Sequence, residues 1–252
     1  MPESTTILIT NDDGIHSEGI KVLAESLSTI GNIWIVAPQH EQSAVGHSLT
    51  LHKPLRVYEL GEKKLAVNGT PTDCVYLTIN SLMDTKPDLL VSGINLGGNM
   101  GDDITYSGTV SAAWEGTLLG IPSFAISMLP DSQDVFHFKP ASEFARRLAQ
   151  AILKYGLPSN TLLNVNVPNT NGSPINQYKI TRQGRRIFGE PIVEKVDPRG
   201  EKYYWIGGPY LGFEDIPDSD LLAVHQKFIA ITPILLDLTN YALIENLLRW
   251  DI

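Results

Sequence analysis

The sequence is poor in cysteine and in long apolar runs. Cys74 is the single cysteine among 252 residues, which excludes an intramolecular disulfide framework and suits a reducing compartment. No apolar run approaches the ~20 residues of a membrane span. Residues 1–6 lack the basic start and the apolar stretch of a signal peptide. We therefore expect a cytoplasmic protein with no membrane partner.

Positive charge is also scarce. The chain has 19 Lys and Arg residues against 28 Asp and Glu residues, a net charge of −9. This argues against binding of DNA or RNA duplexes, which needs a basic surface. A small phosphorylated substrate is still compatible with this charge, because a bound metal ion inverts the local field. The 42% hydrophobic content is ample for a substantial core.

Strands and helices are expected to alternate through the first two thirds of the chain. The expected strands are residues 7–10, 32–37, 56–60, 64–67, 88–92, 123–127 and 161–167, and the expected helices are residues 18–28, 71–83, 107–119 and 141–155. Alternation of this kind predicts an α/β fold, with a mostly parallel, doubly wound sheet flanked by helices in three layers.

The composition changes from about Asn169. Gly, Pro, Asn and charged residues become frequent and separate short strand candidates at residues 178–181 and 202–206. A strand returns at 227–232, and residues 241–248 form an amphipathic helix. We therefore expect a core of residues 1–168 and a smaller β-rich extension of residues 169–252. That extension comprises an arm, the returning core strand and a final helix, and such arms often mediate oligomer contacts.

Two adjacent carboxylates, Asp12 and Asp13, follow the first expected strand. Open α/β sheets bind ligands beyond the carboxyl ends of their strands. Two neighbouring carboxylates are costly to hold together unless positive charge neutralises them, and residues 11–14 include no Lys or Arg. Mg²⁺ or Mn²⁺ would suit these hard oxygen ligands. The alternative is that the aspartates cap a helix or form an ordinary Asp-Gly turn.

The loop after the second expected strand carries a cluster of polar side chains. Within residues 38–47, Ser43 offers a hydroxyl, and Glu41, His40 and His47 offer charge or proton transfer. The spacing of the two histidines matches no standard zinc signature. We expect most of these groups to lie on the loop surface and one or two to be functional.

Two further segments supply an amide and an anion site. The glycine-rich residues 92–101 follow another expected strand, and Asn95 or Asn99 offers an amide oxygen there. Residues 106–109 open a helix, whose first N–H groups and hydroxyls could cradle a phosphate. The alternative for this second segment is simple capping of the helix by Ser107.

Five motifs follow one another along the chain. They are NDDG at 11–14, AP-x-x-E-x-S at 37–43, NGTPTDC at 68–74, SGIN-x-G-x-N-x-G at 92–101 and YSGTV-x-AA-x-EG at 106–116. These motifs, and the later ITP of residues 231–233, resemble those of the SurE (survival protein E) family. The resemblance implies a divalent-metal-dependent phosphatase that hydrolyses nucleoside 5′- and 3′-monophosphates, with some members also trimming short polyphosphate.

The resemblance also implies site residues and an assembly. By motif position, the metal ligands would be Asp12, Asp13, Ser43 and Asn95, holding one divalent cation per subunit, with Mg²⁺ or Mn²⁺ favoured and Co²⁺ or Zn²⁺ as alternatives. The fold would be a Rossmann-like core whose C-terminal extension is exchanged in a homodimer or homotetramer. Many members have Ala-Pro where this chain has Ser17-Glu18, a difference that would alter only the rim of the site.

The resulting hypothesis is attack on the phosphorus by a water that the metal activates. Asp12 would orient or deprotonate that water, and Asp13 would mainly fix the ion. The non-bridging phosphate oxygens would be held by the start of the helix expected at residues 107–119 and by one asparagine. These residues are Ser107, Gly108, Thr109 and Asn99. His47 is a candidate general acid for the leaving group, although water could suffice.

Three rival functions are weaker. A dinucleotide-dependent oxidoreductase needs G-x-G-x-x-G after its first strand, where this chain has acidic residues. An aspartyl-phosphate enzyme needs a second aspartate two residues from the first, but Gly14 stands two beyond Asp12. A nucleotide- or metal-binding regulator without turnover would use nearly the same ligands, so only a turnover assay separates it from a phosphatase.

Overall fold

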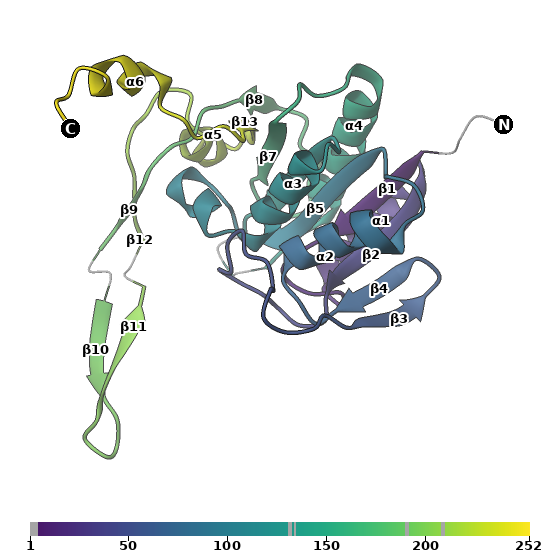
Figure 1. Cartoon of the computed structure of the whole chain (residues 1–252), viewed down its shortest axis with the longest axis horizontal. Helices are drawn as coiled ribbons and strands as arrows, with labels where there is room; N and C mark the ends of the chain where they lie inside the picture. Colours follow the sequence, from purple (N-terminus) through teal and green to yellow (C-terminus); the bar gives the residue numbers. More distant parts are fainter. Residues whose placement is uncertain (1–4, 131–132, 134, 190–191, 208–209) are drawn as a thin grey trace.

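The computed structural model describes residues 5–130, 133, 135–189, 192–207 and 210–252. A mixed sheet runs through it in the order β3-β4-β2-β1-β5-β6-β7-β13-β8 (Figure 1). Its strands are β1 (Thr6–Thr10), β2 (Asn32–Pro38), β3 (Val57–Gly61), β4 (Lys64–Val67), β5 (Leu89–Leu96), β6 (Ser123–Met128), β7 (Thr161–Val167), β8 (Tyr178–Ile180) and β13 (Ile229–Leu235). Neighbouring strands from β4 to β7 are parallel, whereas β3–β4 and β7–β13 are antiparallel.

Helices cover both faces of this sheet. α1 (Glu18–Leu27) and α4 (Lys139–Tyr155) pack together on one face, and α2 (Pro71–Leu77) and α3 (Gly108–Leu118) pack together on the other. Side chains alternate along β1, so that Ile7 and Ile9 join the core beneath α1 and α4, while Leu8 joins the core beneath α2 and α3. The predicted three-layer α/β fold is confirmed.

The helix expected at residues 71–83 is only partly α-helical. Thr70 caps its start in a reciprocal box with Asp73, as the Thr-Pro sequence predicts. The α-helix ends at Leu77, and the chain continues as a π-helical turn over Thr78–Leu82. At this junction the Thr78 hydroxyl donates to the Cys74 carbonyl at 2.6 Å, a side-chain contact that competes with regular backbone bonding.

The strand expected at residues 88–92 extends through the glycine-rich segment to Leu96. Gly93 permits this, because its φ is +144° and an added Cβ would lie 2.3 Å from the Ile126 carbonyl oxygen of β6. Asn95 therefore lies at the end of a strand. β2 and β5 flank β1 on opposite sides, so the chain order reverses at β1, which is where open α/β sheets form ligand crevices.

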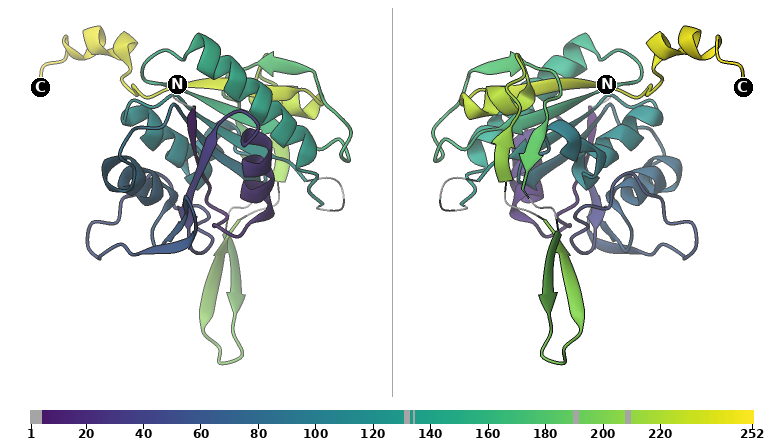
Figure 2. Two further views of the ribbon diagram at one scale, coloured as in Figure 1. Left: turned by 90° about the vertical axis from the view of Figure 1, so that its right-hand side faces the viewer. Right: turned by 90° about the vertical axis from the view of Figure 1, so that its left-hand side faces the viewer.

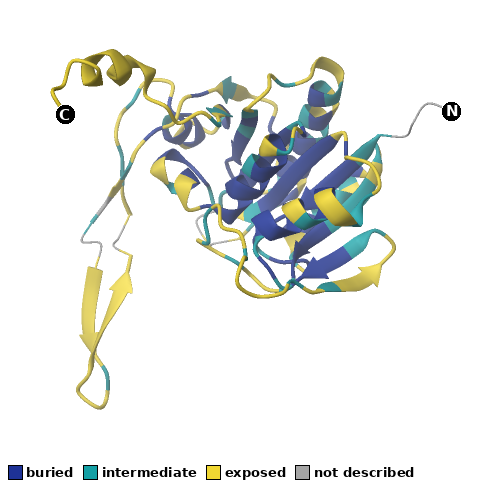
Figure 3. Cartoon of the chain, viewed as in Figure 1, coloured by how far each residue is buried: buried dark blue, intermediate teal, exposed yellow. Residues whose placement is uncertain are grey.

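The C-terminal extension contains several short elements that the sequence pattern did not predict. β9 (Arg186–Phe188) pairs with β12 (Tyr210–Phe213), and β10 (Ile192–Val196) pairs with β11 (Lys202–Ile206) in a hairpin that stands away from the sheet (Figure 2). The hairpin is exposed along its length, as is α6 (Tyr241–Leu247) (Figure 3). α5 (Asp220–His225) is also new in the extension, and a 3₁₀ turn at Gly101–Thr105 is new in the core.

The predicted returning strand is present as β13, which pairs with β7 on one side and β8 on the other. The expected strand at residues 202–206 is also confirmed as β11. The final helix, expected to be amphipathic, has no buried residue. No helix in the described part of the chain is long and apolar enough to cross a membrane.

Candidate active site

A cleft of about 430 Å³ opens at the carboxyl ends of β1, β2 and β5. Its lining includes all four predicted metal ligands, which come from the loops after β1 and β2 and from the end of β5. The lining residues are Asp12, Asp13, Ser17, Glu18, Glu41, Ser43, Ala44, Asn95, Leu96, Gly98, Asn99, Asp103, Tyr106 and Ser107. Five of these carry carboxyl groups, and none of the fourteen is Lys, Arg or His. The cleft therefore has a strongly negative lining.

Asp12 is almost fully buried, with 6% of its surface exposed. The Thr109 hydroxyl donates a short hydrogen bond to Asp12 Oδ1, and the Gln42 N–H donates to the Asp12 carbonyl oxygen at 2.8 Å. Burial raises the pKa of the Asp12 carboxyl, while the hydrogen bond from Thr109 opposes that rise. The turn before α1 is built by Asn11, and Ser17 is the N-cap of α1. The helix-cap alternative for Asp12 and Asp13 is therefore wrong.

Asp13 lies beside Asp12 and is half-buried. The Leu96 N–H donates to its Oδ2 at 3.3 Å. Burial, followed by the negative charge of Asp12, raises the pKa of the Asp13 carboxyl to about 7. A pair of carboxyls in this state lacks a compensating positive charge, and a divalent cation bound between them would supply it.

The two remaining predicted ligands are held by local hydrogen bonds. Ser43 Oγ donates to Glu41 Oε1 at 2.6 Å, which fixes the hydroxyl at the mouth of the cleft. Asn95 Nδ2 donates to the Gly97 carbonyl oxygen at 2.8 Å. This contact sets the orientation of the Asn95 amide, whose Oδ1 is the atom that could bind a cation.

The four predicted phosphate-binding residues are differently placed. Asn99 and Ser107 line the cleft, and Ser107 also caps α3, because its Oγ accepts from the Val110 N–H at 3.1 Å. Gly108 and Thr109 contact Asp12 and do not line the cleft. A Cβ added to Gly108 would stand 2.8 Å from Asp12 Cβ, and the Thr109 hydroxyl donates a hydrogen bond to Asp12. The phosphate role of all four stays a prediction.

The donor set fits a hard divalent cation. Two carboxylates, a hydroxyl and an amide oxygen converge on one cleft, which is the ligand chemistry of Mg²⁺ or Mn²⁺. Within the described residues, no group of three or more His, Cys, Asp and Glu side chains is arranged as a metal site, so nothing there resembles a histidine- or cysteine-based zinc centre. His40 is exposed and does not line the cleft.

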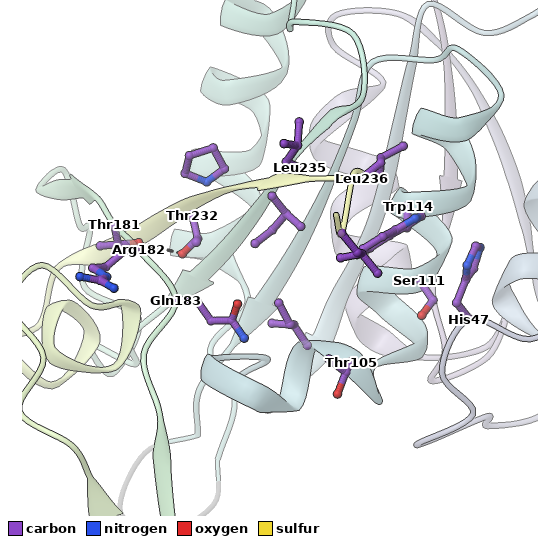
Figure 4. A pocket seen from close by; sticks show the side chains of 14 residues that line it. His47, Thr105, Ser111, Trp114, Thr181, Arg182, Gln183, Thr232, Leu235 and Leu236 are labelled. Atoms are coloured by element: carbon purple, nitrogen blue, oxygen red, sulfur yellow. Dashed lines mark hydrogen bonds between the residues drawn. The ribbon is translucent and has the colours of Figure 1, made fainter. Parts of the chain in front are cut away.

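His47 lies outside the acidic cleft. Its Nε2 is 2.7 Å from Glu115 Oε2, and its ring lies 6.2 Å from that of Trp114. His47 and Trp114 stand at one end of a second, more apolar cavity of about 810 Å³ between α3 and β13 (Figure 4). His47 does not line the acidic cleft, so its role as general acid stays a prediction.

The cleft lining also includes residues that were not predicted as ligands. Glu18, expected to alter the rim of the site, does line it, together with Ser17. Asp103 belongs to the 3₁₀ turn that follows the glycine-rich segment, and it pairs with Arg186 of β9 at 2.7 Å. No local pattern joins positions so far apart in the chain, so sequence spacing held no signal for this pair.

The fold and the cleft define an α/β protein with an acidic, oxygen-rich crevice at the topological switch point of its sheet. Comparison with known proteins then gives the family. The model of the family described as "Survival protein SurE" matches residues 7–190, and this chain belongs to that family.

Relatives align with the chain from end to end. The protein named 5′-nucleotidase SurE from Geotalea daltonii is 51% identical over 98% of this chain and 99% of its own length. The protein of the same name from Geobacter sulfurreducens is 53% identical over 98% of this chain and 94% of its own length. The crystal structure of the SurE protein from Aquifex aeolicus is 42% identical, with a TM-score of 0.86 over 96% of this chain and 97% of that chain.

Proposed function

We propose that this chain is a divalent-metal-dependent 5′-nucleotidase, which hydrolyses nucleoside monophosphates to nucleoside and phosphate. The observation that carries the proposal is the convergence of Asp12, Asp13, Ser43 and Asn95 on one cleft beside the start of α3. The name 5′-nucleotidase shared by its relatives supports the same activity. We include nucleoside 3′-monophosphates and short polyphosphate among the proposed substrates.

In this proposal Asp13, Ser43 and Asn95 hold one divalent cation together with Asp12, most simply Mg²⁺ or Mn²⁺. When bound, the cation supplies positive charge for the phosphate and increases the acidity of a water molecule. Asp12 is the proposed catalytic base: its buried Oδ1 is held by Thr109, so the carboxylate is oriented before substrate arrives. Both aspartates must be ionised for this, which the cation's charge favours.

The phosphate-binding wall of the cleft is the proposed role of Asn99 and the first turn of α3. Ser107 and the backbone of Gly108 stand at the positive end of the α3 dipole, where an anionic oxygen is stabilised. Thr109 contributes through Asp12. Because these groups are fixed before substrate binds, they cost little reorganisation as charge develops on the phosphoryl group.

Phosphate release is the test of this proposal. Chelator-treated protein would be assayed with nucleoside 5′- and 3′-monophosphates and short polyphosphate, with and without Mg²⁺ or Mn²⁺, beside Asp12→Asn. Metal-dependent release that disappears in the variant supports the nucleotidase. Binding of nucleotide with no release from any substrate would instead support the non-catalytic regulator.

We also propose that the chain forms a homodimer or homotetramer through its C-terminal extension. Two parts of that extension present apolar side chains to solvent: Trp205 and Ile206 on the β10–β11 hairpin, and Ile244 and Leu248 at α6. Exposed apolar surface of this extent is typical of protein interfaces. Light scattering coupled to size exclusion tests this proposal directly. Trp205→Ser and Ile244→Ser should reduce the mass per particle, and a monomeric wild type would contradict the proposal.

The cytoplasmic location expected from the sequence stays a prediction.

A further inference from the structure

A ribbon of the C-terminal extension, residues 184–216 apart from 190, 191, 208 and 209, is fastened to one wall of the acidic cleft. That wall is the segment of residues 97–103, which includes Asn99. The β9–β12 pair begins where the ribbon leaves the body of the molecule, and the β10–β11 hairpin lies at its far end (Figures 1 and 2). The ribbon therefore connects a cleft wall with an exposed hairpin.

One fastening is the buried carboxylate of Asp220, which has no exposed surface. Its Oδ2 accepts the Gly101 N–H of the wall, and its Oδ1 accepts the Gly184 N–H of the ribbon, both at 2.9 Å. The two glycines are in close contact, since a Cβ added to Gly101 would lie 3.0 Å from the Gly184 carbonyl oxygen. Gln183 Nε2 donates to the Gly101 carbonyl oxygen at 2.9 Å. Wall and ribbon thus share one carboxylate.

The second fastening is the guanidinium of Arg186, at the start of the ribbon. Its Nε lies 2.7 Å from Asp103 Oδ2, as an ion pair rather than an aligned hydrogen bond. Its Nη2 donates to the Gly98 carbonyl oxygen at 3.1 Å. Only 20% of the Arg186 side chain is exposed, so the contacts are shielded from solvent more than a surface pair would be. The positive charge also opposes the rise in pKa that burial gives Asp103 and Asp220.

The core of the molecule holds two positions of the same wall, Gly97 and Asn99. The Gly97 N–H donates to the Met128 carbonyl oxygen of β6 at 2.9 Å. The Asn99 N–H donates to Asn166 Oδ1 at 2.8 Å, and Asn164 and Asn166 both donate to the Asn99 carbonyl oxygen. Asn99 Nδ2 donates to Ser127 Oγ at 2.8 Å. On either side of Asn99, Arg186 of the ribbon holds Gly98 and Asp103, and Asp220 of α5 holds Gly101.

We propose that Arg186 and Asp220 are positioning residues for hydrolysis, which set the geometry of the phosphate-side wall through the docked ribbon. The inference rests on the proposed nucleotidase function, with Asn99 at the phosphate. It makes turnover depend on the ribbon, whose far end is exposed. Association of subunits at the hairpin would then act on the cleft through Arg186 and Asp220.

Neighbouring arginines give a matched test. Arg186→Gln removes the contacts of the guanidinium with Asp103 and Gly98. Arg185→Gln is the control, because Arg185 is 63% exposed and pairs with Asp102 and Glu214 at longer distances of 3.8 and 3.5 Å. We expect Arg186→Gln to lower kcat about tenfold, since small misplacements of binding groups cost up to ~10²-fold. The unfolding temperature should change little, and Arg186→Lys should recover part of the loss. Arg185→Gln should leave kcat and KM unchanged.

Hydrogen exchange supplies a readout that is independent of activity. Amides of residues 97–105 should exchange faster in Arg186→Gln, and faster still in Asp220→Asn where that variant folds, with no change in Arg185→Gln. The inference is overturned if Arg186→Gln keeps kcat within twofold of wild type, or if Arg185→Gln has the same effect. If wild type releases no phosphate, the proposed function fails by itself, and unchanged exchange at residues 97–105 would then refute the positioning role.

Discussion

The hydroxyl of Thr109, in the first turn of α3, donates a hydrogen bond to the carboxylate of Asp12, which lies beyond the end of β1. The two residues are 97 positions apart, and both are buried. The contact joins the helix that starts beside the cleft to the proposed catalytic carboxylate. Because Thr109 is fully buried, a substitution that keeps its shape isolates the hydrogen bond from the packing.

Thr109→Val replaces the hydroxyl with a methyl group of similar shape. A hydrogen bond to a charged group contributes about 1.5–3 kcal/mol, so we expect kcat to fall about tenfold or more while the unfolding temperature changes by only a few degrees. Thr109→Ser keeps the donor and should keep most of the activity. Steady-state kinetics of both variants decide the point, and equal losses in the two would show that the hydroxyl has no role.

Asp12→Asn and Asp13→Asn should lower activity without lowering the stability of the metal-free protein. Loss of a general base typically costs about 10²–10⁴-fold in rate, and we expect a loss of that order in Asp12→Asn. In metal-free protein both variants should be at least as stable as wild type, because each removes one of two neighbouring carboxyls. Phosphate release and thermal unfolding of the same samples measure both effects. A variant that is inactive because it is unfolded would not support the assignment.

The pH dependence of metal-free protein should report Asp13. Burial and the charge of Asp12 raise the Asp13 pKa to about 7, from an ordinary value near 4. A raised carboxyl pKa favours the protonated form in the fold, so this contribution to stability is complete below pH ~4 and is lost as the pH rises to about 7. The unfolding temperature of chelated wild type should fall more steeply over this range than that of Asp13→Asn.

Mg²⁺ added at pH 7 to 8 should reverse that loss, because a ligand that binds only the native state stabilises it by mass action. Equal pH profiles in wild type and Asp13→Asn would contradict the Asp13 assignment.

Gly108→Ala should impair the site by crowding Asp12. The added methyl would lie 2.8 Å from Asp12 Cβ and 3.0 Å from its Oδ2, closer than carbon and oxygen atoms normally approach. We expect a loss of kcat of at least about tenfold, since displacement of a catalytic group by a fraction of an ångström is costly. Gly61→Ala is the control, because its nearest neighbour would be 4.0 Å away. The pair is compared by kcat, and equal activities would show that Asp12 tolerates displacement.

The parallel core, and the sheet edge at which the acidic cleft lies, could both be predicted because they depend on local sequence patterns. β7 has the predicted bounds, and α1 and α3 differ from the prediction by a residue at their ends. Asp12, Ser43 and Asn95 could be brought to one edge from their positions after successive parallel strands, without knowledge of any contact. Here strand periodicity and the rule for parallel sheets contain the necessary information.

The rest depends on contacts between distant segments. Periodicity gave no reason for the 3₁₀ turn at Gly101–Thr105, which is stabilised by Asp220 through the Gly101 N–H. β10 is held only by its pairing with β11 and has no buried face. Its sequence therefore lacks the alternation of apolar and polar residues that predicts a strand on a core. The phosphate role of Thr109 stays a prediction, and the hydrogen bond from its hydroxyl to Asp12 is visible only once the start of α3 lies against the loop after β1.

Manganese binding and phosphate release, followed together in one titration, test the central claim most directly. Chelator-treated wild type and Asp13→Asn would each be titrated with Mn²⁺, and bound Mn²⁺ would be counted by electron paramagnetic resonance as nucleoside monophosphate is hydrolysed. The account predicts one tightly bound Mn²⁺ per chain, with release of phosphate rising in proportion to it, and loss of both in Asp13→Asn. Phosphate release without bound metal, or undiminished Mn²⁺ binding in Asp13→Asn, would contradict it.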